Sequence, residues 1–178
     1  MGTLDVLPAR DRPDLVAAPV AAALAVWSGP VPVEEIGVVE IDPELADTVT
    51  FCERYGVGLN ESANCVVIAA RRGGETRFAA CMVLAATRAD VNGLVRKHLD
   101  ARRASFAPLD AAVAETGMEY GGITPIGLPT NWPILVDAAV AESSRVVVGS
   151  GVRRSKLTLP GKALAELPGA VVLEGLGR

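Results

Sequence analysis

The sequence predicts an α+β fold, in which a single domain has a mixed β-sheet with helices packed against it. The chain has 178 residues, a usual length for one domain, and no linker divides it. Two apolar stretches, 63–70 and 76–86, flank the sequence Arg-Arg-Gly-Gly and predict a hairpin. Other predicted strands are separated by helical segments. Hairpin and helical connections therefore both occur, which argues against a doubly wound parallel sheet.

The first third of the chain predicts a helix, a strand and a second helix. Apolar residues within 15–27 fall on one helical face, and Pro19 among them predicts a kink or two short helices in sequence. Residues 36–41 predict a strand. A short helix from residue 47 or 48 to 55 follows, with Gly56 in the position of its C-cap.

The predicted hairpin forms the centre of the sheet. Its first strand, 63–70, is apolar enough to be buried on both faces, and 71–74 form the turn. Asp90 then caps a predicted helix that extends to about Arg103 and carries basic residues on its solvent face.

The second half of the chain predicts short strands that alternate with short helices. A helix from Pro108 ends at Gly117, before a glycine-rich loop. The other elements are strands at 105–107, 133–137, 144–148, 156–159 and 170–173, a turn at Val140 and a helix at 161–167.

Composition and charge exclude several classes of protein. The net charge is −4 and the pI is about 5.1, whereas proteins that follow long stretches of nucleic-acid backbone are usually basic. Contact with one nucleic-acid end through a local basic patch stays open. Three scattered cysteines and one histidine provide neither a disulfide framework nor a zinc site, so we expect no metal and no cofactor.

The apolar run 15–27 does not predict a membrane segment. Acidic residues precede it, where a signal peptide needs positive charge, and it is too short to cross a bilayer. We therefore expect a cytoplasmic protein with reduced thiols and no membrane partner. The sequence leaves the oligomeric state open.

One stretch, 116–129, combines four glycines and two prolines with apolar residues. Glycine lets a ligand approach bare peptide N–H groups and proline stiffens the backbone, so such a loop suits an oxyanion, a carbonyl or a ribose. The composition is equally typical of a simple connection. A second glycine cluster follows at Gly149–Gly151. Neither cluster matches the glycine patterns of dinucleotide-binding or NTP-binding loops.

Several motifs occur in an order that is typical of a known family. The residues that carry it are Gly121 and Pro125 in a Gly-x-x-x-Pro loop, Asp137 after the following strand, and Gly149–Gly151 with Arg153. From about residue 47 to the C-terminus, the sequence resembles the YbaK/prolyl-tRNA synthetase-associated editing domains, which remove mischarged amino acids from tRNA.

This resemblance implies a fold, a domain division and partners. The sheet would be barrel-like, and residues 47–178 would form the editing domain. Residues 1–46, which do not match the family closely, would be a helical and strand extension packed on that domain. The aminoacyl-tRNA acceptor end would be the partner, with an aminoacyl-tRNA synthetase as a further candidate.

The resemblance also implies a hydrolytic pocket built largely from backbone. Its catalytic groups would be Asn64, which orients the water or the carbonyl, and the N–H groups of Gly121 and Gly122, which stabilise the oxyanion. Its substrate-binding residues would be Ile123, Thr124, Pro125, Asp137, Gly149, Ser150, Gly151 and Arg153.

Asn64 is a departure from the family, because members with deacylase activity carry a lysine at this position. A neutral amide replaces a positive charge, and losing one charge-assisted contact costs about 1.5–3 kcal/mol. Lys156 is another source of an ammonium, but the sequence gives no distance between it and the pocket. Cys65 follows Asn64 in the strand, so we expect its side chain to face the core.

Three functions stay open. The first is a free-standing aminoacyl-tRNA deacylase, with Asn64 in place of the lysine. The second is a catalytically degenerate binding module of the same fold, for an aminoacyl-nucleotide-like or other small ligand. The third is a hydrolase of another ester or amide. Arg71, Arg72 and Arg77 are either contacts for tRNA or ordinary solvated arginines.

Overall fold

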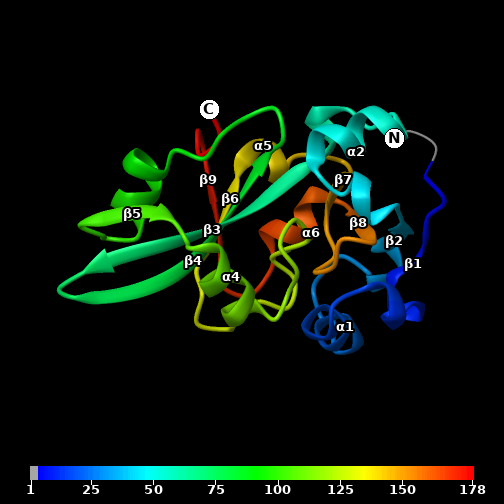
Figure 1. Cartoon of the computed structure of the whole chain (residues 1–178), viewed down its shortest axis with the longest axis horizontal. Coiled ribbons are helices and arrows are strands. Elements are labelled where there is room, and N and C mark those ends of the chain that lie inside the picture. Colours follow the sequence, from blue (N-terminus) through cyan, green and yellow to red (C-terminus); the bar gives the residue numbers. More distant parts are fainter. Residues whose placement is uncertain (1–3) are drawn as a thin grey trace.

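The computed structural model describes residues 4–178, which form two β-sheets with short helices around them (Figure 1). One sheet has the order β1-β2-β8-β7, formed by Leu7–Pro8, Gly37–Glu40, Ser155–Leu159 and Val146–Gly149. The other has the order β5-β3-β4-β6-β9, formed by Arg103–Phe106, Ala63–Arg72, Glu75–Leu84, Ile134–Asp137 and Ala170–Leu173. All pairings are antiparallel except β4–β6 and β6–β9. The predicted α+β class, with mixed and largely antiparallel strands, is confirmed.

The arrangement of the strands differs in one detail from the barrel-like central sheet that was expected. The strands form two sheets, which are joined by an isolated bridge between Ser62 and Val147. A barrel requires the two edge strands of a sheet to pair with each other. Here β5 and β9 stay at opposite edges of one sheet, and β1 and β7 at opposite edges of the other, so neither sheet closes.

The central hairpin is confirmed. β3 and β4 pair from Ala63 with Leu84 to Arg72 with Glu75, and Figure 1 shows them projecting from one end of the molecule. The turn consists of Gly73 and Gly74, whose φ angles of 60° and 86° suit the two-residue turns that match the twist of a hairpin. β3 is therefore longer than predicted and includes the arginines that were assigned to the turn, whereas β4 begins one residue earlier and ends two residues earlier than predicted.

The N-terminal region begins with two 3₁₀ turns, Ala9–Asp11 and Pro13–Leu15, before helix α1 (Ala18–Ala25). Of the two outcomes predicted for this stretch, no kink occurs at Pro19, whereas the 3₁₀ turn Pro13–Leu15 and α1 are two short helices in sequence. Pro19 lies in the first turn of α1, where its missing N–H has no acceptor within the helix in any case. Strand β2 pairs with β8 over four residues, so the region before residue 47 shares a sheet with C-terminal strands.

The longer helices after β2 begin and end close to the predicted residues. Helix α2 (Thr48–Tyr55) ends at Gly56, and α4 (Leu109–Thr116) ends at Gly117, both glycines having left-handed φ angles. The remaining short elements are α5 (Ala138–Ala141), α6 (Gly161–Ala165) and the 3₁₀ turns Val33–Glu35, Pro43–Leu45 and Leu59–Glu61.

The helix after Asp90 is shorter than predicted. The Asp90 carboxylate caps it as expected, by accepting hydrogen bonds from the backbone N–H groups of Gly93 and Leu94. It consists of a π-helical turn, Val91–Val95, and a single α-turn, α3 (Arg96–His98). The chain then leaves the helix because Asp100 has a left-handed φ of 48°, and β5 begins soon after.

The core is aliphatic, as the low aromatic content predicts. Its largest cluster joins α1 to the four-stranded sheet, through residues such as Val20, Leu24, Ile36 and Leu157. A second cluster lies between the five-stranded sheet and the π-helical turn. Among residues 4–178, no helix has the length and apolar character needed to cross a membrane.

Candidate functional site

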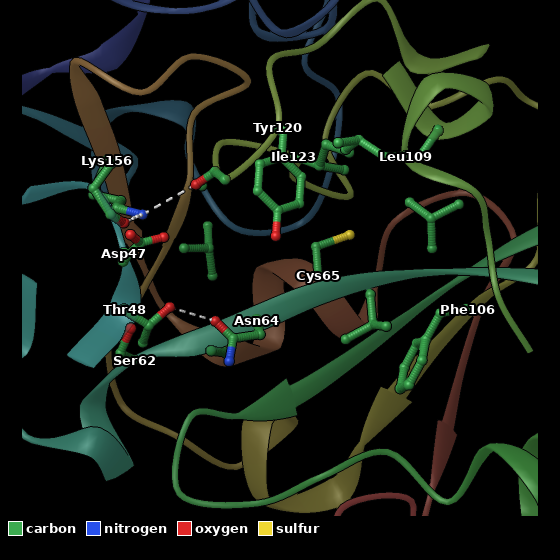
Figure 2. Close-up of a pocket in the computed structure, with 18 of the residues that line it drawn as sticks. Asp47, Thr48, Ser62, Asn64, Cys65, Phe106, Leu109, Tyr120, Ile123 and Lys156 are labelled. Atoms are coloured by element: carbon green, nitrogen blue, oxygen red, sulfur yellow. Dashed lines mark hydrogen bonds between the residues drawn. The ribbon is translucent and has the colours of Figure 1, made fainter. Parts of the chain in front are cut away.

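A cavity of about 430 Å³ lies between the two sheets (Figure 2). Its walls come from the start of α2, the first half of β3, the end of β5, α4, the loop 120–123 and the neighbouring ends of β7 and β8. Polar side chains gather at one end and apolar side chains at the other, the polar ones being Asp47, Thr48, Asn64 and Lys156 and the apolar ones Phe106, Leu109 and Ile123.

The two glycine segments meet at the edge of this cavity. The N–H of Gly151 donates to the Gly122 carbonyl at 2.7 Å, and the N–H of Glu119 donates to the Gly151 carbonyl at 2.8 Å. A Cβ on Gly149 would lie 2.2 Å from the Gly122 carbonyl oxygen, far inside van der Waals contact. The segments therefore pack backbone against backbone, which side chains would prevent.

Gly121 and Gly122 differ in what their N–H groups do. The Gly122 N–H donates to the Glu119 carbonyl at 3.0 Å, within a turn. Gly121 has a left-handed φ of 81°, and no residue in the described range 4–178 accepts from its N–H. Gly121 also lines the cavity. Of the two amides predicted as oxyanion donors, the N–H of Gly121 is therefore the one that remains for a ligand.

Asn64 lines the same cavity as Gly121, from the start of β3. Its Oδ1 accepts a hydrogen bond from the Thr48 hydroxyl at 2.7 Å (Figure 2). Thr48 is the first residue of α2, so this contact ties the helix to the strand. Because the oxygen is engaged, the two N–H groups of the amide are the part of Asn64 that remains for a ligand.

Lys156 extends into the polar end of the cavity from β8. Its side chain is buried, with 6% of the residue exposed. The ammonium donates to the Ala46 carbonyl at 2.9 Å and lies 3.5 Å from the Gly121 carbonyl (Figure 2). Burial, and then the nearby Arg153, lower the pKa of Lys156 to about 8, although Asp47 and Cys52 act in the opposite direction.

A family model for the aminoacyl-tRNA editing domain matches residues 42–167 of the chain. The chain belongs to the aminoacyl-tRNA editing domain family. The resemblance inferred from Gly121, Pro125, Asp137 and the second glycine segment is confirmed.

Solved structures similar to this editing domain support the same fold. A protein described as a candidate trans-editing enzyme for prolyl-tRNA synthetase superposes with a TM-score of 0.73, at 20% identity over 88% of this chain and 93% of the other. A scaffold protein from computational epitope grafting gives 0.74, at 22% identity over 89% and 95%. The hypothetical protein APE2540 gives 0.70, at 20% identity over 79% and 90%. At these identities the likeness concerns the fold.

Cys65 also lines the cavity of the editing domain, beside Asn64. We expected the Cys65 side chain to face the core, and it does pack there, but it also lines the cavity, which extends along successive residues at the beginning of β3. The thiol is half-buried and packs against the aliphatic core. Burial raises its pKa well above the ordinary value, with a smaller contribution from Cys81. A thiol held in the neutral form is a poor nucleophile.

Ile123, Thr124 and Pro125, the predicted substrate-binding residues of the first glycine loop, do not all face the same cavity. Ile123 lines the cavity, together with Gly121. Thr124 is fully buried, and its hydroxyl has no hydrogen-bond partner within residues 4–178. Pro125 lines a separate cavity of about 500 Å³, which it shares with Trp27.

Two other predicted residues have evident structural contacts. Asp137 caps α5 by accepting from the Ala139 N–H at 2.9 Å, and it accepts from the Gly177 N–H at 2.6 Å. Ser150 is fully buried and donates to the Ser155 carbonyl at 2.9 Å. Neither Asp137 nor Ser150 lines the cavity around Gly121.

Arg153 lies behind the cavity wall. A Cβ on Gly121 would come within 2.7 Å of its Nη1, and its Nη2 donates to the Pro43 carbonyl at 3.0 Å. Asp47, Thr48 and Tyr120 line the cavity and were not predicted as site residues. No sequence signal distinguishes Thr48 from an ordinary first residue of a helix.

Proposed function

We propose that this cavity hydrolyses the ester that joins an amino acid to the terminal ribose of a mischarged tRNA, acting in trans on the acceptor end. One observation supports this most strongly. All residues that line the cavity fall within the segment 42–167 that matches the aminoacyl-tRNA editing domain. The part of the chain that identifies the family is therefore the part that builds the cavity.

The proposed reaction needs little from the protein, because an aminoacyl ester is already activated. A water oxygen bonds to the carbonyl carbon, and the C=O π electrons move onto the carbonyl oxygen. The intermediate then expels the ribose oxygen, which takes up the proton lost by the water. The Gly121 N–H would donate to the oxyanion, and the Asn64 amide N–H groups would hold the water or the carbonyl. The vicinal ribose hydroxyl would assist the proton transfer, which accounts for a site without a histidine.

The apolar end of the cavity would receive the amino-acid side chain. Phe106, Leu109 and Ile123 line it (Figure 2), and no charged group in the described lining lies beside them. An apolar pocket separates side chains mainly by size, at about 1–3 kcal/mol per methylene. We therefore expect preference for a small, uncharged amino acid.

The test compares two glycines with the same backbone requirement. Gly121 and Gly175 both have left-handed φ angles, 81° and 68°, so valine strains either. Only Gly121 lines the cavity, whereas no atom lies within 4 Å of a Cβ on Gly175. We expect Gly121→Val to lower deacylation about 100-fold, because small displacements of reacting groups have such effects, and Gly175→Val to leave it within a few-fold. Equal effects in both variants would contradict the proposed site.

One observation favours a second candidate, a ligand-binding module without turnover. The Asn64 oxygen is engaged by Thr48, and by the sequence resemblance Asn64 would stand where family members with deacylase activity carry a lysine. In this case wild type would release no amino acid from any charged tRNA, while Asn64→Lys would gain activity. Activity in wild type excludes this alternative.

A further inference from the structure

Lys156 is a buried cation whose charge no carboxylate in residues 4–178 neutralises directly. The salt bridges of this range do not include it, and its two protein acceptors are the neutral carbonyls of Ala46 and Gly121. An ammonium has three N–H donors, so one remains after these two contacts. Burying a charge without a paired counter-charge is costly, which makes Lys156 an unusual residue to retain for stability alone.

The fold directs this ammonium into the cavity. Lys156 is opposite Val39 of β2 and Gly149 of β7, so its backbone is fixed in the middle of the four-stranded sheet. The ammonium lies 5.7 Å from the centre of the Phe51 ring, within reach of a cation–π interaction that favours the charged form.

Burial is the largest influence on the pKa of Lys156 and lowers it, and the neighbouring groups act in both directions. Asp47, at the start of α2, and Cys52, within that helix, raise the pKa of Lys156, whereas Arg153 in the loop before β8 lowers it. Asp47 lines the cavity as well (Figure 2), but it is not within salt-bridge distance of the ammonium.

We propose that Lys156 supplies, from β8, the positive charge that Asn64 on β3 lacks, and that its ammonium binds the carbonyl oxygen of the aminoacyl ester. This inference rests on the proposed function. Lys156 and Asn64 line the same polar end of the cavity, from opposite sheets, and Gly121 contributes its carbonyl to one and its free N–H to the ligand. As water adds to the carbonyl carbon, negative charge develops on the oxygen that the ammonium contacts. Lys156 keeps its proton throughout and changes no bond.

The first experiment measures deacylation by wild type, Lys156→Met and Lys156→Gln. Lys162→Met is the matched control, because Lys162 is an exposed lysine on α6 that pairs with Glu166. We expect Lys156→Met and Lys156→Gln to lose about 100- to 1,000-fold in kcat, the effect of removing one oxyanion donor, and the control to retain wild-type rates. Glutamine can still donate to the Ala46 carbonyl, so its loss of activity reports the charge and not the hydrogen bond that joins α2 to β8.

A second variant separates a chemical role from a structural one. Asn64→Lys is combined with Lys156→Met, which returns an ammonium to the cavity from β3. We expect the double variant to recover at least 10-fold in kcat over Lys156→Met. The proposal is overturned if Lys156→Met loses activity together with a lowered Tm and the double variant recovers none of that activity. Lys156 would then have a structural role only.

Binding distinguishes failure of this inference from failure of the proposed function. The probe is a 3′-aminoacylamido-adenosine, in which an amide replaces the ester, titrated into each variant by calorimetry. We expect Lys156→Met to bind it about 10- to 150-fold more weakly than wild type and Lys162→Met to bind it equally. A wild type that binds but does not hydrolyse, with binding lost in Lys156→Met, supports the lysine and refutes the deacylase. Equal binding in wild type and Lys156→Met, or no binding by either, overturns the proposal.

Discussion

Gly149→Ala tests whether the contact between the two glycine segments holds the cavity in shape. Gly149 is the last residue of β7, and its neighbour across the strand pair is Lys156. An added Cβ would lie 2.2 Å from the carbonyl oxygen of Gly122 and 2.6 Å from that of Ile123. Both contacts are with backbone, so no side chain can rotate to relieve them.

The size of the effect follows from these distances. Ordinary contact begins near 3.4 Å, so the loop around Gly122 must move by roughly 1 Å. Overpacking of this kind costs about 1–3 kcal/mol, or a decrease in Tm of about 2–12 °C for a chain of this size. A displacement of about 1 Å at reacting groups costs on the order of 100-fold in rate. We therefore expect a clear loss of deacylation in a protein that still folds at 25 °C.

The assay pairs thermal unfolding with release of amino acid from charged tRNA. Gly58→Ala is the control, because a Cβ there meets first the end of the Glu61 side chain, at 3.2 Å, which can shift. The control should change Tm and rate little. If Gly149→Ala also retained wild-type Tm and rate, the close backbone contact between the glycine segments would be refuted.

Three further predictions concern the charges and the thiol of the site. The Lys156 ammonium is present below its pKa of about 8 and lost above it, so kcat/KM of wild type should fall as pH rises through that value. The fall should be absent in Lys156→Gln, and a flat pH profile of wild type would contradict this prediction. Cys65→Ser should lower kcat less than about 5-fold, since burial keeps the thiol neutral, and complete loss of single-turnover hydrolysis would restore it as a nucleophile. Arg71 on β3 and Arg103 on β5 are direct partners, and such a pair of like charges is unfavourable for folding, which favours a role in binding phosphate groups of tRNA. Changing both arginines to glutamate should therefore weaken the binding of charged tRNA and flatten its salt dependence, without affecting the adenosine probe.

Local chemistry made part of the fold predictable. Gly73 and Gly74 define the central turn, and Gly56 and Gly117 end helices where the sequence indicates. The division of the strands into two sheets was not predictable, because it depends on the pairing of β2 with β8, far apart in the chain.

The sequence indicated the backbone segments of the candidate site better than it indicated the positions of its side chains. Residues of both glycine segments were predicted as site residues, and the structure brings the two segments into contact. Asp137 fitted the family pattern, but the sequence did not reveal that its carboxylate caps a helix. The sequence indicated Lys156 as a second source of an ammonium, but it gave no distance between Lys156 and the pocket. Its closeness to Gly121 depends on how β8 is placed between β2 and β7.

The most direct test of the central claim is the rate at which wild type releases the amino acid from tRNAs charged with alanine, serine, cysteine, threonine or proline. We predict release at least 100-fold faster than in buffer for one or two small amino acids, with the largest effect below pH 8. Rates equal to the buffer blank for all five charged tRNAs would contradict the assignment of this cavity as a deacylase site.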